Sequence, residues 1–181
     1  MAKFIALLRG INVSGQKKIK MADLRALFVE LGFTRVATYI QSGNVVFDAG
    51  GSRPPELKSR IEAAISDVYG FDVVVILRSG RELTKIISKN PYQDRDGIAH
   101  DKLYVAFLSG PVSGGFDELM SVPSGEDSFI PSEGEVYLHC PGGFGKTVYN
   151  NNSIEKAAGV PATTRNWRTV NRLAGMLEED L

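Results

Sequence analysis

One stretch of the chain decides the order of its secondary-structure elements: residues 35–47, which read RVATYIQSGNVVF. Two runs rich in β-branched and aromatic residues, 35–40 and 44–47, flank the tripeptide Gln41-Ser42-Gly43. Strand-forming runs on either side of a short, glycine-containing segment are typical of a β-hairpin. We therefore predict two neighbouring antiparallel strands here, joined by a tight turn.

A helix and a strand are predicted on each side of this hairpin. Before it, the apolar run 4–8 indicates a buried strand, and residues 21–31 place apolar side chains at helical spacing. After it, a helix runs from about residue 55 to a stop at Gly70, and residues 72–77 form another apolar strand. The resulting order, β-α-β-β-α-β, is that of the split-βαβ, ferredoxin-like motif.

The second half of the sequence repeats this order except at its end. Its predicted strands and helices are, in chain order, 103–108, 116–120, 128–131, 135–140, 148–158 and 166–178. We therefore predict an α+β fold of tandem ferredoxin-like halves, of which the second lacks its last strand. Residues 79–82 predict a capping box for a further helix. The polar segment 91–101 is the predicted linker between the halves 1–90 and 102–181.

Composition restricts the class of protein. The chain has 181 residues, no net charge and 43% hydrophobic residues, as an ordinary soluble globular protein has. No apolar run approaches the ~18 residues of a membrane span, so we expect no membrane partner. The single cysteine, Cys140, rules out an internal disulfide and makes the cytoplasm the expected compartment. The oligomeric state is left open.

Two donor-rich segments at opposite ends of the sequence are candidates for ligand binding. The first, residues 9–18, follows the apolar run 4–8, and the second, residues 163–169, opens the last predicted helix. Both are poor in carboxylates, which suits an anionic ligand because arginine holds phosphate or carboxylate in a two-pronged hydrogen bond. The predicted ligand-binding residues are Arg9, Asn12, Gln41, Ser42, Asn44, Arg165, Asn166 and Trp167.

These residues also have a structural interpretation, which the sequence leaves open. Arg9 would pair with a carboxylate at the edge of the core, and Asn12 and Asn44 would cap turns. Trp167 would anchor the core, since a lone tryptophan does this more often than it stacks on a nucleic-acid base.

A glycine-rich stretch, residues 135–147, has the outline of a phosphate-binding loop. A predicted strand is followed there by glycines and then by Gly145-Lys146-Thr147. Loops of that class have a glycine where this chain has Cys140, because main-chain amides must close around the phosphates. We therefore predict a weaker anion-binding turn or a plain connection rather than a nucleoside-triphosphatase loop.

Groups that could carry catalysis are few. His100 and His139 are the only histidines, and neither has metal-ligand spacing with acids or with Cys140, so we expect no metal site. Cys140 falls on the apolar side of its predicted strand, which indicates a buried, unreactive thiol. An enzyme would have to act by positioning and electrostatic stabilisation, with Arg9, Arg165 and Lys146 as the available stabilising groups. The cofactor is left open.

Three motifs together resemble a known family: LLRGINV (7–13), TYIQSGNVVF (38–47) and ATTRNWRTV (162–170). They are similar to the bacterial domain-of-unknown-function family DUF1697, and the resemblance extends over essentially the whole chain. It implies an α+β fold with ferredoxin-like pieces and brings no assigned activity.

The leading functional hypothesis is binding of a small anionic ligand or nucleotide between the two halves. One alternative is an enzyme of unknown reaction that acts on a phosphorylated or anionic substrate. Another is a nucleic-acid-binding module that uses an exposed sheet, which requires aromatic and basic side chains facing outward. The mostly aliphatic strands 4–8 and 45–47 and the sequence pI of about 6.7 disfavour this last alternative.

Overall fold

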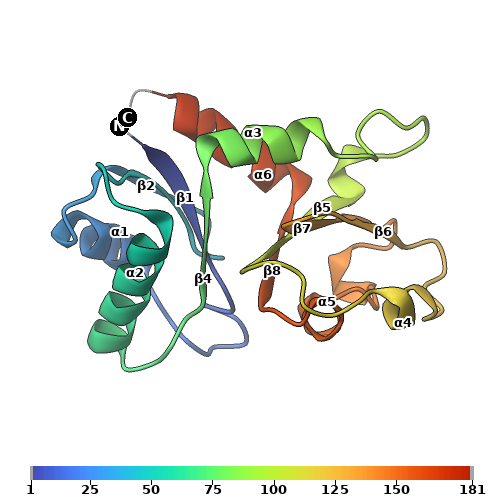
Figure 1. Ribbon diagram of the computed structural model, residues 1–181, viewed down its shortest axis with the longest axis horizontal. Coiled ribbons are helices and arrows are strands. Elements are labelled where there is room, and N and C mark those ends of the chain that lie inside the picture. The colour runs from blue at the N-terminus through green and yellow to red at the C-terminus, as the bar shows by residue number, and fades with distance from the viewer. Residues whose placement is uncertain (1, 180–181) are drawn as a thin grey trace. The chain divides into compact units, whose positions relative to one another are not determined.

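The computed structural model describes residues 2–179, which form two four-stranded antiparallel sheets and six α-helices (Figure 1). The architecture is mixed α+β, as the sequence predicted. The chain divides into two compact units. The first unit runs to Thr84 and resumes at Arg172, and the second unit is Lys85–Asn171.

The first sheet has the strand order β2-β3-β1-β4. Its strands are β1 (Lys3–Leu8), β2 (Thr34–Tyr39), β3 (Asn44–Asp48) and β4 (Val75–Ser79). The central strand is β1, in which Ala6 lies opposite Val45 on one side and Leu77 on the other. A continuous apolar run suits this position because both faces of the strand are covered. The predicted order of elements and the hairpin of β2 and β3 are confirmed.

Two helices, α1 (Met21–Glu30) and α2 (Pro54–Tyr69), cover one face of this sheet (Figure 1). Their apolar faces share one buried cluster with the strands, in which Phe28 of α1 packs edge to face on Phe47 of β3 at 5.1 Å between ring centroids. The stop predicted at Gly70 is confirmed, since this residue ends α2 in the left-handed conformation, with φ of 74°.

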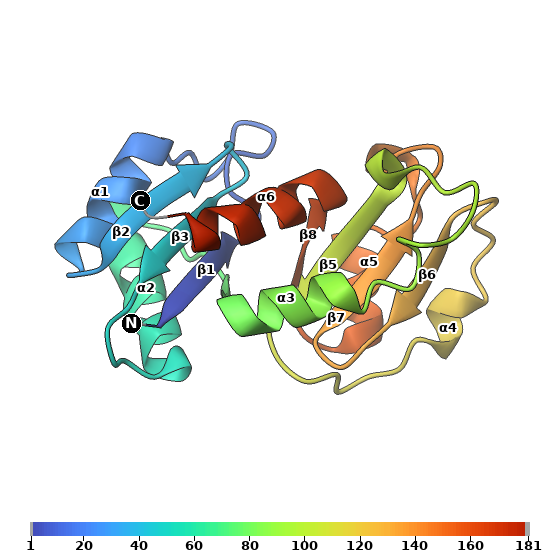
Figure 2. The ribbon, with the colours of Figure 1, turned by 90° about the horizontal axis from the view of Figure 1, so that it is seen from above.

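The opposite face of the first sheet carries Ile5, Leu7, Val46 and Ile76, none more than 3% exposed. The C-terminal end of α6 (Trp167–Glu178) lies over β1 and β3 on this face (Figure 2). The predicted division assigned everything from residue 102 onward to the second half. The structure divides the chain differently, because the segment that begins at Arg172 belongs to the first unit.

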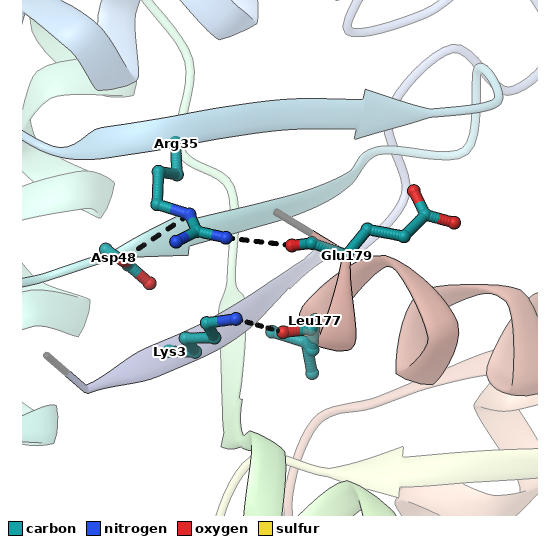
Figure 3. A network of polar contacts seen from close by, with 5 residues as sticks. All are labelled: Lys3, Arg35, Asp48, Leu177 and Glu179. Carbon is teal, nitrogen blue, oxygen red and sulfur yellow. Dashed lines mark hydrogen bonds and ion pairs between the residues drawn. The ribbon is translucent and has the colours of Figure 1, made fainter. Parts of the chain in front are cut away.

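Two cationic side chains hold that end of α6 through its main-chain carbonyls (Figure 3). Lys3 Nζ donates to the carbonyl of Leu177 at 2.6 Å, and Arg35 Nη2 donates to that of Glu179 at 2.8 Å. Arg35 lies in a β-bulge of β2 with φ of 52°, and a bulge redirects the side chain of its residue. Its Nε is 3.8 Å from Oδ2 of the buried Asp48.

The second sheet has the order β6-β7-β5-β8, which repeats the arrangement of the first. Its strands are β5 (Leu103–Leu108), β6 (Ser128–Pro131), β7 (Glu135–His139) and β8 (Ala162–Asn166). The helices α4 (Asp117–Met120) and α5 (Asn151–Ala158) pack on one face around a cluster that includes Leu138 and Ile154. The remaining elements are α3 (Gly80–Ser88) and two 3-10 turns, His100–Lys102 and Phe144–Lys146. The capping box predicted for α3 forms between Ser79 and Glu82.

The prediction that the second half lacks its last strand is wrong, because β8 pairs with β5 along its whole length. Thr163 lies opposite Phe107, and Arg165 lies opposite Val105. Of the three buried side chains of β8, those of Thr163 and Arg165 are polar, although they are only 2% and 6% exposed. A strand whose buried side chains are polar shows no alternation of apolar and polar residues, which is the signal used to predict strands.

Candidate functional site

The loop after β1 contains a short two-residue hairpin, residues 12–17. Gln16 N donates to Val13 O at 2.9 Å, and Asn12 N donates to Lys17 O at 3.2 Å. At its tip, Ser14 and Gly15 have φ values of 50° and 74°, as the tight primed turns of two-residue hairpins require. The donor-rich segment is therefore an ordered projection with a defined backbone.

Asn12 fastens this hairpin to the rest of the first unit. Its Nδ2 donates to the carbonyls of Ile19 at 2.9 Å and Gln41 at 2.8 Å. Its Oδ1 accepts from Ile19 N at 2.9 Å. Three hydrogen bonds commit this amide to the protein itself, which supports the structural interpretation of Asn12.

The turn between β2 and β3 lies against the base of the hairpin. Leu8 N donates to Gly43 O at 2.9 Å, and the carbonyl of Gln41 is an acceptor for Asn12. The fully buried Asn44 donates from Nδ2 to Tyr39 O at 2.8 Å and to Ser42 Oγ at 3.1 Å. The structure thus brings the predicted residues between 9 and 44 to one end of the first sheet, with both asparagines bonded internally.

A pocket of about 580 Å³ opens beside the hairpin, within the first unit. Its lining residues are Arg9, Lys17, Glu62, Ala63, Ser66, Asp67, Asp72, Val73 and Val74. Arg9 is half-buried at the end of β1, where its main-chain N donates to Val74 O at 2.9 Å. Lys17 is exposed, and its Nζ donates to the main-chain carbonyl of Asp72 at 2.6 Å. The volume is within the range of ~300–1,000 Å³ typical of small-molecule sites.

The acidic wall of the pocket was not predicted from the sequence. Glu62 Oε1 accepts from Val75 N at 2.8 Å, and Asp72 Oδ1 accepts from Ser66 Oγ at 3.0 Å. The side chain of Asp67 is exposed and makes no hydrogen bond or ion pair with any residue between 2 and 179. These side chains lie on the polar face of α2 and on the loop after it, where the sequence shows only a solvated surface.

The remaining predicted residues, Arg165, Asn166 and Trp167, belong to the second unit. Burial lowers the pKa of the Arg165 guanidinium to about 10, which leaves it charged at neutral pH. Its Nη1 donates to Thr163 Oγ1 at 2.8 Å and to Thr164 O at 3.0 Å. Asn166 Oδ1 accepts from Thr169 N at 2.8 Å and so caps α6. Trp167 is 5% exposed, which supports its interpretation as a core anchor.

The glycine-rich stretch does not lead directly into a helix. Lys146 ends a 3-10 turn, and α5 begins only at Asn151, because Asn150 Oδ1 accepts from Ser153 N at 3.1 Å and caps it there. The buried thiol predicted at Cys140 is confirmed, and burial raises its pKa from 9.0 to about 11.

The face of each sheet that could bind nucleic acid is covered. In the second sheet, Phe107 and Tyr137 point to this face and are 0% and 2% exposed. In the first sheet, the same face carries the buried aliphatic side chains of β1, β3 and β4. Single-stranded RNA or DNA stacks on exposed aromatic rings in sheets of this kind, so the structure offers little support for that alternative.

Within residues 2–179, no three histidine, cysteine, aspartate or glutamate side chains come together as a metal site would require. None of the helices described is both long and apolar enough to cross a bilayer.

Comparisons with known proteins give a family and a similar structure. A family model described as "Protein of unknown function (DUF1697)" matches residues 1–137. The structure is similar to that of the conserved bacterial protein SP0830 from Streptococcus pneumoniae, with a TM-score of 0.71 and 23% sequence identity over 97% of this chain and 98% of that chain. At this identity the similarity shows the fold alone. No curated protein matches the sequence.

Proposed function

Since the chain belongs to DUF1697, a family of proteins of unknown function, we propose a function from its own geometry: it binds a small anionic ligand in the pocket lined by Arg9 and Lys17. The observation that carries the proposal is that two cationic side chains of the segment 9–18 line one pocket. Arg9 directly follows β1, and Lys17 closes the hairpin that comes next in the chain.

The backbone around these two cations supports the proposal because it is held in place before a ligand arrives. Asn12 bonds the hairpin to Ile19 and to the turn after β2, so the loop does not have to become ordered on binding. Preorganisation of this kind removes part of the entropy cost of association. Asn44 stabilises the same turn through its hydrogen bonds to Tyr39 O and Ser42 Oγ.

We also propose that each unit is a ferredoxin-like fold. Both sheets place their last strand beside their first, followed by the third and the second, with every pair antiparallel. In each unit, one helix follows the first strand and another follows the third. This order supports the ferredoxin-like assignment and puts the loop after the first strand at an open end of the sheet.

The test is calorimetric titration with ethyl phosphate and with inorganic phosphate. The variants are Arg9→Ala and Lys17→Asn; asparagine is chosen because it tolerates the φ of 46° at Lys17. Lys18→Asn is the matched control, since Lys18 is an exposed lysine of the same loop that does not line the pocket.

A hydrogen bond to a charged group contributes roughly 1.5–3 kcal/mol, so each pocket variant should lose about tenfold or more in affinity. Lys18→Asn should bind as the parent does. The proposal fails if the parent binds neither anion, or if all the variants bind equally well.

A further inference from the structure

We infer that the ligand of this pocket is zwitterionic, with an ammonium group beside its anionic group. The inference rests on the proposed function and specifies the class of ligand for the same site. It comes from the distribution of charge around the pocket: Arg9 and Lys17 supply two cations, whereas α2 and the loop after it supply three carboxylates. A purely anionic ligand would meet repulsion from those carboxylates.

The three carboxylates have different roles. Glu62 is bonded to the main chain of Val75 and lies 3.9 Å from Lys58 Nζ, and Asp72 accepts from Ser66, so both help to hold the walls of the pocket. The side chain of Asp67 has no hydrogen bond or ion pair to the part of the chain that the structure describes. It is therefore the carboxylate available to a ligand.

Lys17 does not form an ion pair with Asp67. Its ammonium group is bonded to the main-chain carbonyl of Asp72, and no ion pair forms between Lys17 and a carboxylate of the pocket. A single available carboxylate suits an ammonium group, whereas a divalent cation requires several oxygen ligands. Carboxylates that line the pocket together with the two cations also disfavour simple anions, because repulsion of the wrong ligand contributes to specificity as well as attraction of the right one.

The experiment compares two probes that differ only in an amine: phosphoethanolamine and ethyl phosphate. Both are titrated at pH 8, where each phosphate group is essentially a dianion. The proteins are the parent, Asp67→Asn and Asp96→Asn, the last a control at an exposed aspartate of the second unit.

The parent should bind phosphoethanolamine about two- to fivefold more tightly than ethyl phosphate, within the range expected of a solvent-exposed ion pair. Asp67→Asn should abolish this preference and should bind ethyl phosphate at least as well as the parent. Asp96→Asn should keep the preference.

Two outcomes would overturn the inference and leave the proposed function standing. One is that the parent binds both probes equally, and the other is that Asp67→Asn keeps the preference, provided in each case that ethyl phosphate binding is lost in Arg9→Ala. If the parent binds neither probe, the proposed function fails first, and the inference fails with it.

Discussion

At the residue scale, Gly43 shows how closely two segments approach each other. Its φ is +83°, and an added Cβ would lie 2.6 Å from Ile11 Cδ1 and 2.9 Å from Leu8 Cβ. The side chain of Ile11 can move, but Leu8 Cβ is fixed to the central strand. Gly43→Ala should therefore destabilise the protein by about 2–4 kcal/mol, from left-handed strain and overpacking together. Chemical denaturation measures this loss.

Gly50→Ala is the matched control for that prediction. Gly50 also has a positive φ, +64°, but nothing lies within 4 Å of its added Cβ. This variant should lose only the backbone term of roughly 1–2 kcal/mol. Equal losses in the two variants would show that the contact with Leu8 is unimportant.

The thiol of Cys140 allows a prediction about pH. Burial raises its pKa from 9.0 to about 11, so the folded state keeps a proton that the unfolded chain gives up. Its contribution to stability is complete below pH 9 and is lost as the pH rises from 9 toward 11. At pH 8 the native thiol should react with a thiol reagent about a hundredfold more slowly than the thiol of the urea-unfolded chain, because less thiolate is present.

Cys140 is the only cysteine, so Cys140→Ser should abolish labelling in both states. Rapid labelling of the native protein at pH 8 would contradict the burial of this thiol.

At the element scale, the hairpin of residues 12–17 depends on one side chain. Asn12→Asp keeps the acceptor for Ile19 N and tolerates the φ of 55°, but it removes the donors to Ile19 O and Gln41 O. We expect the free energy of unfolding to fall by about 1–3 kcal/mol, since two carbonyls lose their partner. Amide hydrogen exchange at Gln16 should become faster.

Gln16→Glu makes the same chemical change on the same hairpin, at an exposed side chain. It should leave both stability and hydrogen exchange close to those of the parent. If Gln16→Glu loosens the hairpin as much as Asn12→Asp does, the added negative charge rather than the lost hydrogen bonds is responsible.

At the scale of the whole molecule, the chain from Arg172 onward completes the first unit, and Lys3 and Arg35 hold it there. Replacing both, by Lys3→Ala and Arg35→Asn, removes two charge-assisted bonds to the end of α6. Amide exchange in the last turn of α6 should become about tenfold faster or more, given ~1.5–3 kcal/mol for each such bond. Hydrogen exchange with mass spectrometry measures this change in rate.

Lys20→Ala is the control for the lysine, since Lys20 is exposed and does not contact α6. Unchanged exchange in the double variant would mean that the apolar contacts of Met176 and Leu177 hold the helix end by themselves.

Local sequence patterns by themselves determined many of the secondary-structure elements of this protein. Apolar runs and helical spacing placed β1, α1, α2 and β5, since the period of a buried face is set by the element that carries it. The hairpin of residues 35–47 and the capping box at Ser79 were also predictable, because both depend on residues only a few positions apart. The burial of Cys140 followed from its place on an apolar strand.

Tertiary structure alone decided three other features. The segment β8 forms a strand because it pairs with β5, although its buried residues Thr163 and Arg165 are polar. Asp67 lines a pocket with Arg9 because α2 packs on β4, which pairs with β1, and no spacing in the sequence encodes this contact. The end of α6 joins the first unit through Lys3, 174 residues away from Leu177. Each of these three features depends on contacts between residues that are far apart in the sequence, and such contacts form only when the chain folds.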